Sequence, residues 1–148
     1  MSFYTVVMKT LFIIYLIFVF LQDLRTMYYS ENWLYISLFI LCFVWKPYDL
    51  SGSFYGAFMF GLPSALIYKI HKDWIGIADV LFLFYFGWIL GYERILVAMF
   101  IALFIAFLWY VISYFVLHKK EIPFVSCLCV GVGISYLIGY QIFYQILL

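Results

Sequence analysis

The chain has 148 residues and a formal net charge of +1, with 70% hydrophobic and only 10% charged residues. Soluble globular domains carry roughly 25% charged residues, so this composition excludes a soluble or a disordered protein, and the near-neutral charge offers no basic surface for nucleic acid. We therefore predict an all-α integral membrane protein that forms a single domain over residues 1–148, contacts the lipid bilayer and binds no nucleic acid.

Six segments are long and apolar enough to be transmembrane helices, which need about 20 mostly apolar residues. Three of them contain no charge, and the other three contain one charged residue each. In chain order they are Phe3–Gln22, Tyr28–Trp45, Leu50–Tyr68, Trp74–Tyr92, Ile95–Leu117 and Ile122–Leu148. The sequence thus predicts a polytopic helical bundle with about six transmembrane helices.

Basic residues in the connections predict the orientation of this bundle. The connections are short, so consecutive helices are expected to be antiparallel neighbours. Five of the eight basic residues fall in the first, third and fifth connections, namely Arg25, Lys69, Lys72, Lys119 and Lys120. The positive-inside rule therefore places these connections in the cytoplasm and both termini outside.

Two acidic residues stand apart from the charges in the connections. Asp23 closes the first predicted span, and Asp79 lies a few residues into the fourth. A carboxylate in hydrocarbon costs at least about 2.5 kcal/mol. Because the first span runs inward and the fourth outward, both acids are predicted at the same membrane face.

Two carboxylates brought together titrate as a pair and share one proton. This is the electrostatic arrangement of an aspartic protease: one carboxylate takes a proton from the attacking water, and its protonated partner hydrogen-bonds the peptide carbonyl.

Each acid can also have a purely local role in its own helix. Asp23 can end its helix beside Arg25, and Asp79 can be a first-turn residue favoured by the helix dipole. These roles account for the two acids separately and leave their shared face unexplained. A different function for the pair is cation binding in a small ion- or proton-coupled carrier.

Small residues surround Asp79. Gly87 and Gly91 lie on its helical stripe and form a G-x-x-x-G face, a pattern that lets a second helix approach closely. Gly76 and Ala78, just before the acid, keep this approach narrow.

Three blocks of the sequence resemble signatures of the type IV prepilin peptidases, which are GxGD-type intramembrane aspartic peptidases. They occur in the family's order and span nearly the whole chain: Asp23–Met27, Gly76–Asp79 with Gly87 and Gly91 beyond it, and Ile122–Phe124.

The resemblance implies an aspartic endopeptidase that cuts the N-terminal leader from type IV prepilins or pseudopilins, precursors used in pili, protein secretion and competence. It implies a multi-pass protein of the cytoplasmic membrane with its active site toward the cytoplasm. The catalytic pair would be Asp23 and Asp79, supported by Gly76, Ala78, Gly87 and Gly91. No metal or other cofactor is expected, because the nucleophile is water. A catalytically silent relative that binds leaders or membrane partners is the alternative.

The sequence also departs from the family pattern. Ala78 replaces the second glycine of Gly-x-Gly-Asp, and Val125 and Ser126 replace the Gly-Pro that commonly follows Ile-Pro-Phe. No Cys-x-x-Cys pairs are present, so the resemblance implies a short form without the methyltransferase segment. Cys127 and Cys129 are expected to be buried packing residues, with zinc ligation as a lesser alternative.

Overall fold

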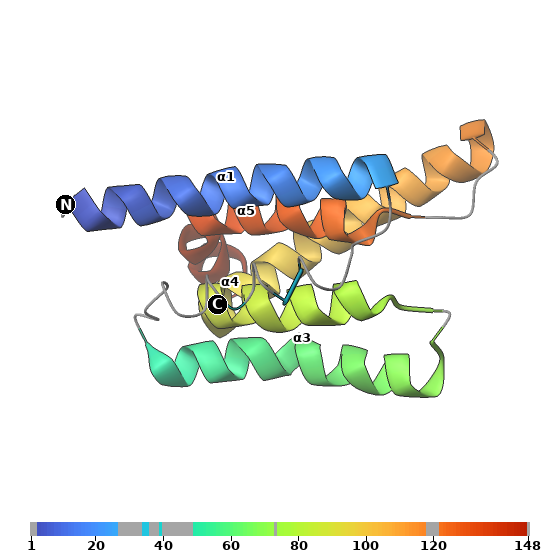
Figure 1. Ribbon diagram of the computed structural model, residues 1–148. Coiled ribbons are helices and arrows are strands. Elements are labelled where there is room, and N and C mark those ends of the chain that lie inside the picture. Colours follow the sequence, from blue (N-terminus) through green and yellow to red (C-terminus); the bar gives the residue numbers. More distant parts are fainter. Residues whose placement is uncertain are drawn as a thin grey trace.

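The computed structural model describes residues 3–26, 34–35, 39, 49–72, 74–117 and 122–147, and its regular structure is helical throughout. Most of the second predicted span lies outside these residues. The elements are α1 (Phe3–Thr26), α3 (Leu50–Ile70), α4 (Ile77–Ile112) and α5 (Phe124–Ile142), and short π-helical segments at Ser113–Leu117 and Phe143–Leu147 extend α4 and α5 (Figure 1). The predicted all-α class is confirmed for the described residues.

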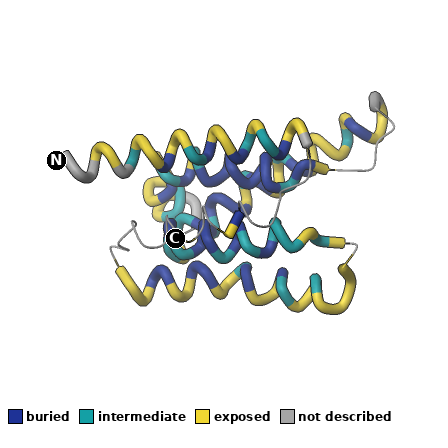
Figure 2. The backbone as a smooth tube through the Cα atoms, viewed as in Figure 1, coloured by how far each residue is buried: buried dark blue, intermediate teal, exposed yellow. Residues whose placement is uncertain are grey.

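The outer surface of the bundle is apolar. Phe18, Phe104 and Leu137 are 63%, 64% and 75% exposed, and yellow exposed faces follow the outside of the helices in Figure 2. Three helical stretches within the described residues are long and apolar enough to cross a membrane, namely Leu50–Ile70, Ile77–Phe115 and Phe124–Gln145. The chain is therefore a helical membrane protein, as predicted.

Helix α4 contains both the fourth and the fifth predicted spans. The sequence suggested a connection between them that includes Arg94, but Arg94 lies within α4, and the only non-helical residue inside this helix is Gly91 (φ 76°, ψ 173°). A positive φ is readily adopted only by glycine, so one residue redirects the chain where a loop was expected. The first half of α4 (residues 77–90) lies beside α3, and the second half (residues 92–112) runs back along α5 (Figure 1).

Close backbone contacts hold these helices together. Gly87 in the first half of α4 lies against Gly56 of α3, and a Cβ on either would overlap the other helix's backbone. Gly131 of α5 similarly approaches the backbone of Ala98 in the second half of α4. Such small residues permit the dense packing on which helix association in lipid depends.

Helix α1 packs through larger side chains. Phe12 contacts Phe86 of α4 with ring centroids 6.4 Å apart, and it also contacts Tyr136 of α5 at 5.2 Å. Tyr15 contacts Tyr85 with centroids 5.8 Å apart. These aromatic contacts place α1 over α5 and the first half of α4, where the buried core of the bundle lies.

The glycine contact between α3 and α4 gives a stability prediction. Gly87→Ala should lower the stability of the detergent-solubilised protein by about 1–3 kcal/mol, because the added methyl group overlaps the Gly56 backbone. Gly133→Ala is the matched control, since a Cβ there has nothing within 4 Å. Thermal unfolding checks both, and equal stability of the two variants would contradict the close contact.

Candidate active site

Asp23 lies in the last turn of α1 and is only 5% exposed. Its Oδ2 atom accepts two hydrogen bonds from Ser126, one from the backbone N–H and one from the hydroxyl, each 2.7 Å long. These lengths are typical of bonds to a charged oxygen. Arg25 is exposed, so the structure supports pairing of Asp23 with Ser126 and not the interpretation that pairs it with Arg25.

Ser126 lies in the first turn of α5, where backbone N–H groups have no partner within the helix. The N-cap residue of α5 is Pro123, which makes no side-chain capping bond. Asp23 therefore supplies the missing acceptor from another helix, 103 positions away in the sequence. A carboxylate at this position also interacts favourably with the positive end of the helix dipole.

Asp79 occupies the first turn of α4 and is partly buried. Its Oδ2 accepts a 3.0 Å hydrogen bond from the backbone N–H of Gly76, the N-cap residue. Asp79 is therefore a first-turn residue, as the local interpretation has it, and its side chain also caps the helix. Ala78, between these two residues, is helical and packs against the edge of the core, so the structure accommodates its Cβ at this position.

The packing of α1 on α4 brings the two acids to the same end of the bundle. Helix α1 and the first half of α4 run in opposite directions (Figure 1), and Phe12 contacts Phe86 while Tyr15 contacts Tyr85. Asp23 follows Tyr15 by two turns, and Asp79 precedes Tyr85 by almost two. The end of α1 and the start of α4 lie at the same side in Figure 1.

The predicted glycine face of α4 packs against α3, whereas Asp23 lies on α1. Gly87 contacts Gly56 of α3, and Gly91 breaks α4. The two glycines therefore fix the course of α4, whereas α1 contacts the first half of α4 through aromatic side chains.

Exposed basic residues surround this end of the bundle. Arg25 lies in the last turn of α1, Lys69 lies in the last turn of α3, and Lys72 follows that helix by two residues. Gly61 of α3 packs on Phe84 and Gly56 on Gly87, so α3 is antiparallel to the first half of α4 and its basic end lies near Asp79. The two other basic residues predicted on this side, Lys119 and Lys120, lie outside the described residues.

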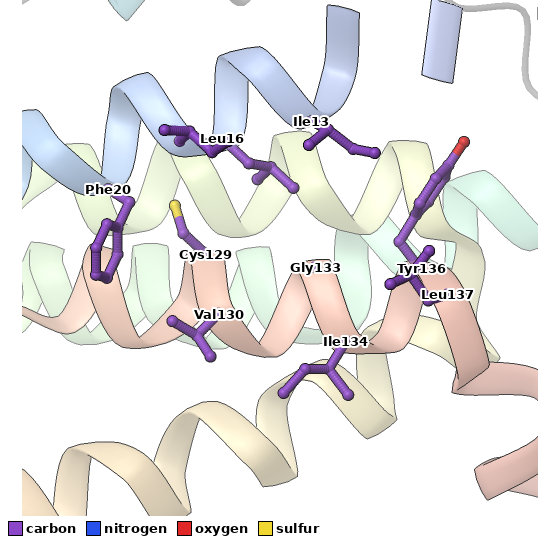
Figure 3. Close-up of a pocket in the computed structure, with 10 residues that line it drawn as sticks. Ile13, Leu16, Phe20, Cys129, Val130, Gly133, Ile134, Tyr136 and Leu137 are labelled. Carbon is purple, nitrogen blue, oxygen red and sulfur yellow. The ribbon is translucent and has the colours of Figure 1, made fainter. Parts of the chain in front are cut away.

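An apolar groove of about 360 Å³ separates part of α1 from α5 (Figure 3). Its lining residues come from two turns of α1 and two turns of α5: Ile13, Leu16, Ile17, Phe20, Cys129, Val130, Gly133, Ile134, Tyr136 and Leu137. Phe20 joins the groove to the acidic site, because its carbonyl lies 3.4 Å from the Ser126 hydroxyl.

The cysteines of α5 belong to the packing of the bundle. Cys127 and Cys129 are free thiols and are both buried, as predicted for packing residues. In the part of the chain that the structure describes, no three His, Cys, Asp or Glu side chains gather in a way that could hold a metal ion.

Ser126 is the site residue that sequence reasoning missed. The sequence marks it only as a departure from the family pattern. Its contact with Asp23 spans 103 positions, and no local spacing indicates such a partner.

Comparison with known protein families identifies one family that the chain matches. Residues 10–112 match the family described as the type IV leader peptidase family. The match covers both acids and the glycines after Asp79. No curated protein and no solved structure matches the chain.

The proximity of the two acids can be checked by crosslinking. With the native cysteines replaced by alanine, a short bifunctional thiol reagent should join Asp23→Cys to Asp79→Cys within one chain, as detected by mass spectrometry of the digested protein. Asp23→Cys with Glu93→Cys is the control, because Glu93 lies after the Gly91 break, at the start of the second half of α4 and one full half-helix away from Asp79.

Each single-cysteine protein is labelled with a monofunctional reagent under the same conditions, so that reactivity is separated from distance. Labelling of both thiols without any crosslink between positions 23 and 79 would contradict the arrangement.

Proposed function

The chain belongs to the type IV leader peptidase family, a family of aspartic-type proteases, and we propose that it is a membrane endopeptidase that removes the N-terminal leader from prepilins or pseudopilins. Asp23 and Asp79 are the proposed catalytic pair. The observation that carries this proposal is that two carboxyl side chains, from helices far apart in the sequence, lie at the same end of an apolar bundle (Figure 1).

The chemistry follows from sharing one proton between the two carboxyl groups. The ionised carboxylate removes a proton from water as the water oxygen attacks the carbonyl carbon of the scissile peptide bond. The protonated carboxyl group gives its proton to the carbonyl oxygen, so that no separate negative charge accumulates. In the collapse of the resulting gem-diol, the carboxyl group that took the proton from water gives it to the leaving nitrogen as the C–N bond breaks. The other carboxylate takes a proton from a hydroxyl of the intermediate, so the leader leaves with a new C-terminal carboxyl group and the pair again holds one proton.

We also propose that the bundle crosses the cytoplasmic membrane about six times, with the acidic pair at the cytoplasmic face. The exposed Arg25, Lys69 and Lys72 at this end support this orientation through the positive-inside rule. Leader cleavage at this face matches a precursor whose N-terminus has not left the cytoplasm.

The cleavage reaction tests the proposal directly. Purified protein in detergent should cut a prepilin that carries its leader, and Asp23→Asn and Asp79→Asn should each lower kcat by a factor of about 10²–10⁴, the usual contribution of general acid–base catalysis. The assay follows loss of the leader on a gel and identifies the cleaved bond by mass spectrometry.

Asp49→Asn is the matched control. Asp49 is an exposed N-cap residue of α3 at the other end of that helix, where it accepts hydrogen bonds from Ser51 and Gly52. Asparagine caps helices about as well as aspartate, so this variant should keep full activity. If the wild-type protein cuts no prepilin or pseudopilin offered to it, the catalytically silent alternative replaces the peptidase.

A further inference from the structure

We infer that Ser126 is a positioning residue that holds the Asp23 carboxylate in one orientation and determines which of its oxygens takes part in proton transfer. This inference rests on the proposed function, because it concerns how one member of the proposed catalytic pair is held. Three observations carry it.

The first observation is that Ser126 uses both of its donors on a single atom. Its backbone N–H and its hydroxyl each donate to Oδ2 of Asp23 over 2.7 Å. A carboxylate oxygen has two in-plane lone pairs, so two donors saturate Oδ2. The remaining oxygen, Oδ1, is then the one that can take a proton from water or share one with Asp79.

The second observation is that the contact is shielded from water. Ser126 is 2% exposed and Asp23 is 5% exposed. In such surroundings a hydrogen bond to a charged group is stronger than at the surface, and water does not readily replace a lost donor. The orientation of the carboxylate therefore depends on Ser126.

The third observation is that the anchor is rigid. Ser126 lies in the first turn of α5, and the N–H of Cys127, the next residue, already bonds to the carbonyl of Pro123 within the helix. The Ser126 hydroxyl also lies 3.4 Å from the carbonyl of Phe20, one turn before Asp23 on α1. Ser126 thus contacts the last two turns of α1 from the first turn of α5, and it holds the Asp23 carboxylate against the N-terminus of α5.

A positioning role differs from a catalytic one in what its loss does. Ser126→Ala removes the hydroxyl and keeps the backbone N–H, so Oδ2 retains one donor and the carboxylate gains freedom to rotate. Binding of a leader does not require a fixed carboxylate, whereas proton transfer does.

The experiment compares Ser126→Ala, Ser126→Thr and Ser135→Ala in the prepilin cleavage assay. Ser126→Ala should lower kcat by about 10- to 100-fold, the effect of losing one hydrogen bond to a charged group, while KM stays within about twofold. Ser126→Thr keeps the hydroxyl and should restore most of the lost kcat. Ser135→Ala removes another buried hydroxyl from α5, one that bonds to the Arg94 carbonyl at a distance from the acids, and should leave kcat unchanged.

The order of the two Ser126 variants separates positioning from packing. Alanine removes one atom and fits the site, whereas threonine adds a methyl group to a fully buried position. A packing role predicts that alanine is tolerated better than threonine, and positioning predicts the reverse. Thermal unfolding of all three variants shows whether each is folded, and if threonine unfolds the protein, the comparison of Ser126→Ala with Ser135→Ala still decides.

The outcomes distinguish this inference from the proposed function. Cleavage by the wild type with unchanged kcat in Ser126→Ala overturns the role of Ser126 and leaves the peptidase standing. Equal losses in Ser126→Ala and Ser135→Ala also overturn it, because the effect is then one of general packing. Absence of cleavage by the wild type overturns both.

Discussion

The hydrogen bonds between Asp23 and the first turn of α5 determine how α1 joins the rest of the bundle. A carboxylate that is 5% exposed needs donors, and a helix that follows Pro123 without a side-chain cap needs an acceptor for its free N–H groups. The bond from the Ser126 N–H to the Asp23 carboxylate satisfies both groups, although the two residues are 103 positions apart in the sequence. Farther along the same pair of helices, Phe12 contacts Tyr136. Helix α1 is thus held on α5 at two places, and the apolar groove lies along the stretch between them.

The two acids are stabilised in the same way, because each accepts a hydrogen bond from a backbone N–H group at the N-terminus of a helix. Asp79 bonds to the N-cap of its own helix, and Asp23 bonds to the first turn of α5. The positive ends of both helix dipoles then face the carboxyl groups, which lowers the cost of a negative charge in apolar surroundings. From the sequence, a role at a helix terminus and a close approach of the acids are competing interpretations. In the folded chain both acids have a role at a helix terminus, and this role is compatible with their lying at the same end of the bundle.

Hydropathy was enough to predict the helical class and the apolar segments α3 and α5, since a chain in lipid has few other ways to satisfy its backbone. The end of α1 and the start of α4, which carry Asp23 and Asp79, lie at the same side of the bundle (Figure 1). The break at Gly91 could not be predicted, because a glycine in an apolar run has the same appearance whether it packs, as Gly87 does, or adopts a positive φ. The contact between Ser126 and Asp23 could not be predicted for a different reason. The partner of Ser126 is set by the packing of α1 on α5, and one of its two donors is a backbone N–H, which every residue except proline possesses.

The distance between Asp23 and Asp79 depends on the helix contacts of α3, α4 and α5 and on the break at Gly91. The first half of α4 carries Asp79 and is held by α3 through Gly56 and Gly87, whereas the second half is packed on α5, whose first turn holds Asp23. The two acids thus belong to two packed units, and Gly91 is the residue through which α4 passes from one to the other. Contacts of Phe12 and Tyr15 with α4 connect the same units a second time. The proposed catalytic pair would have to share a proton and would tolerate little change in spacing. Under that proposal, the conformation of one glycine and the aromatic packing of α1 bear on the chemistry even though neither is part of the pair.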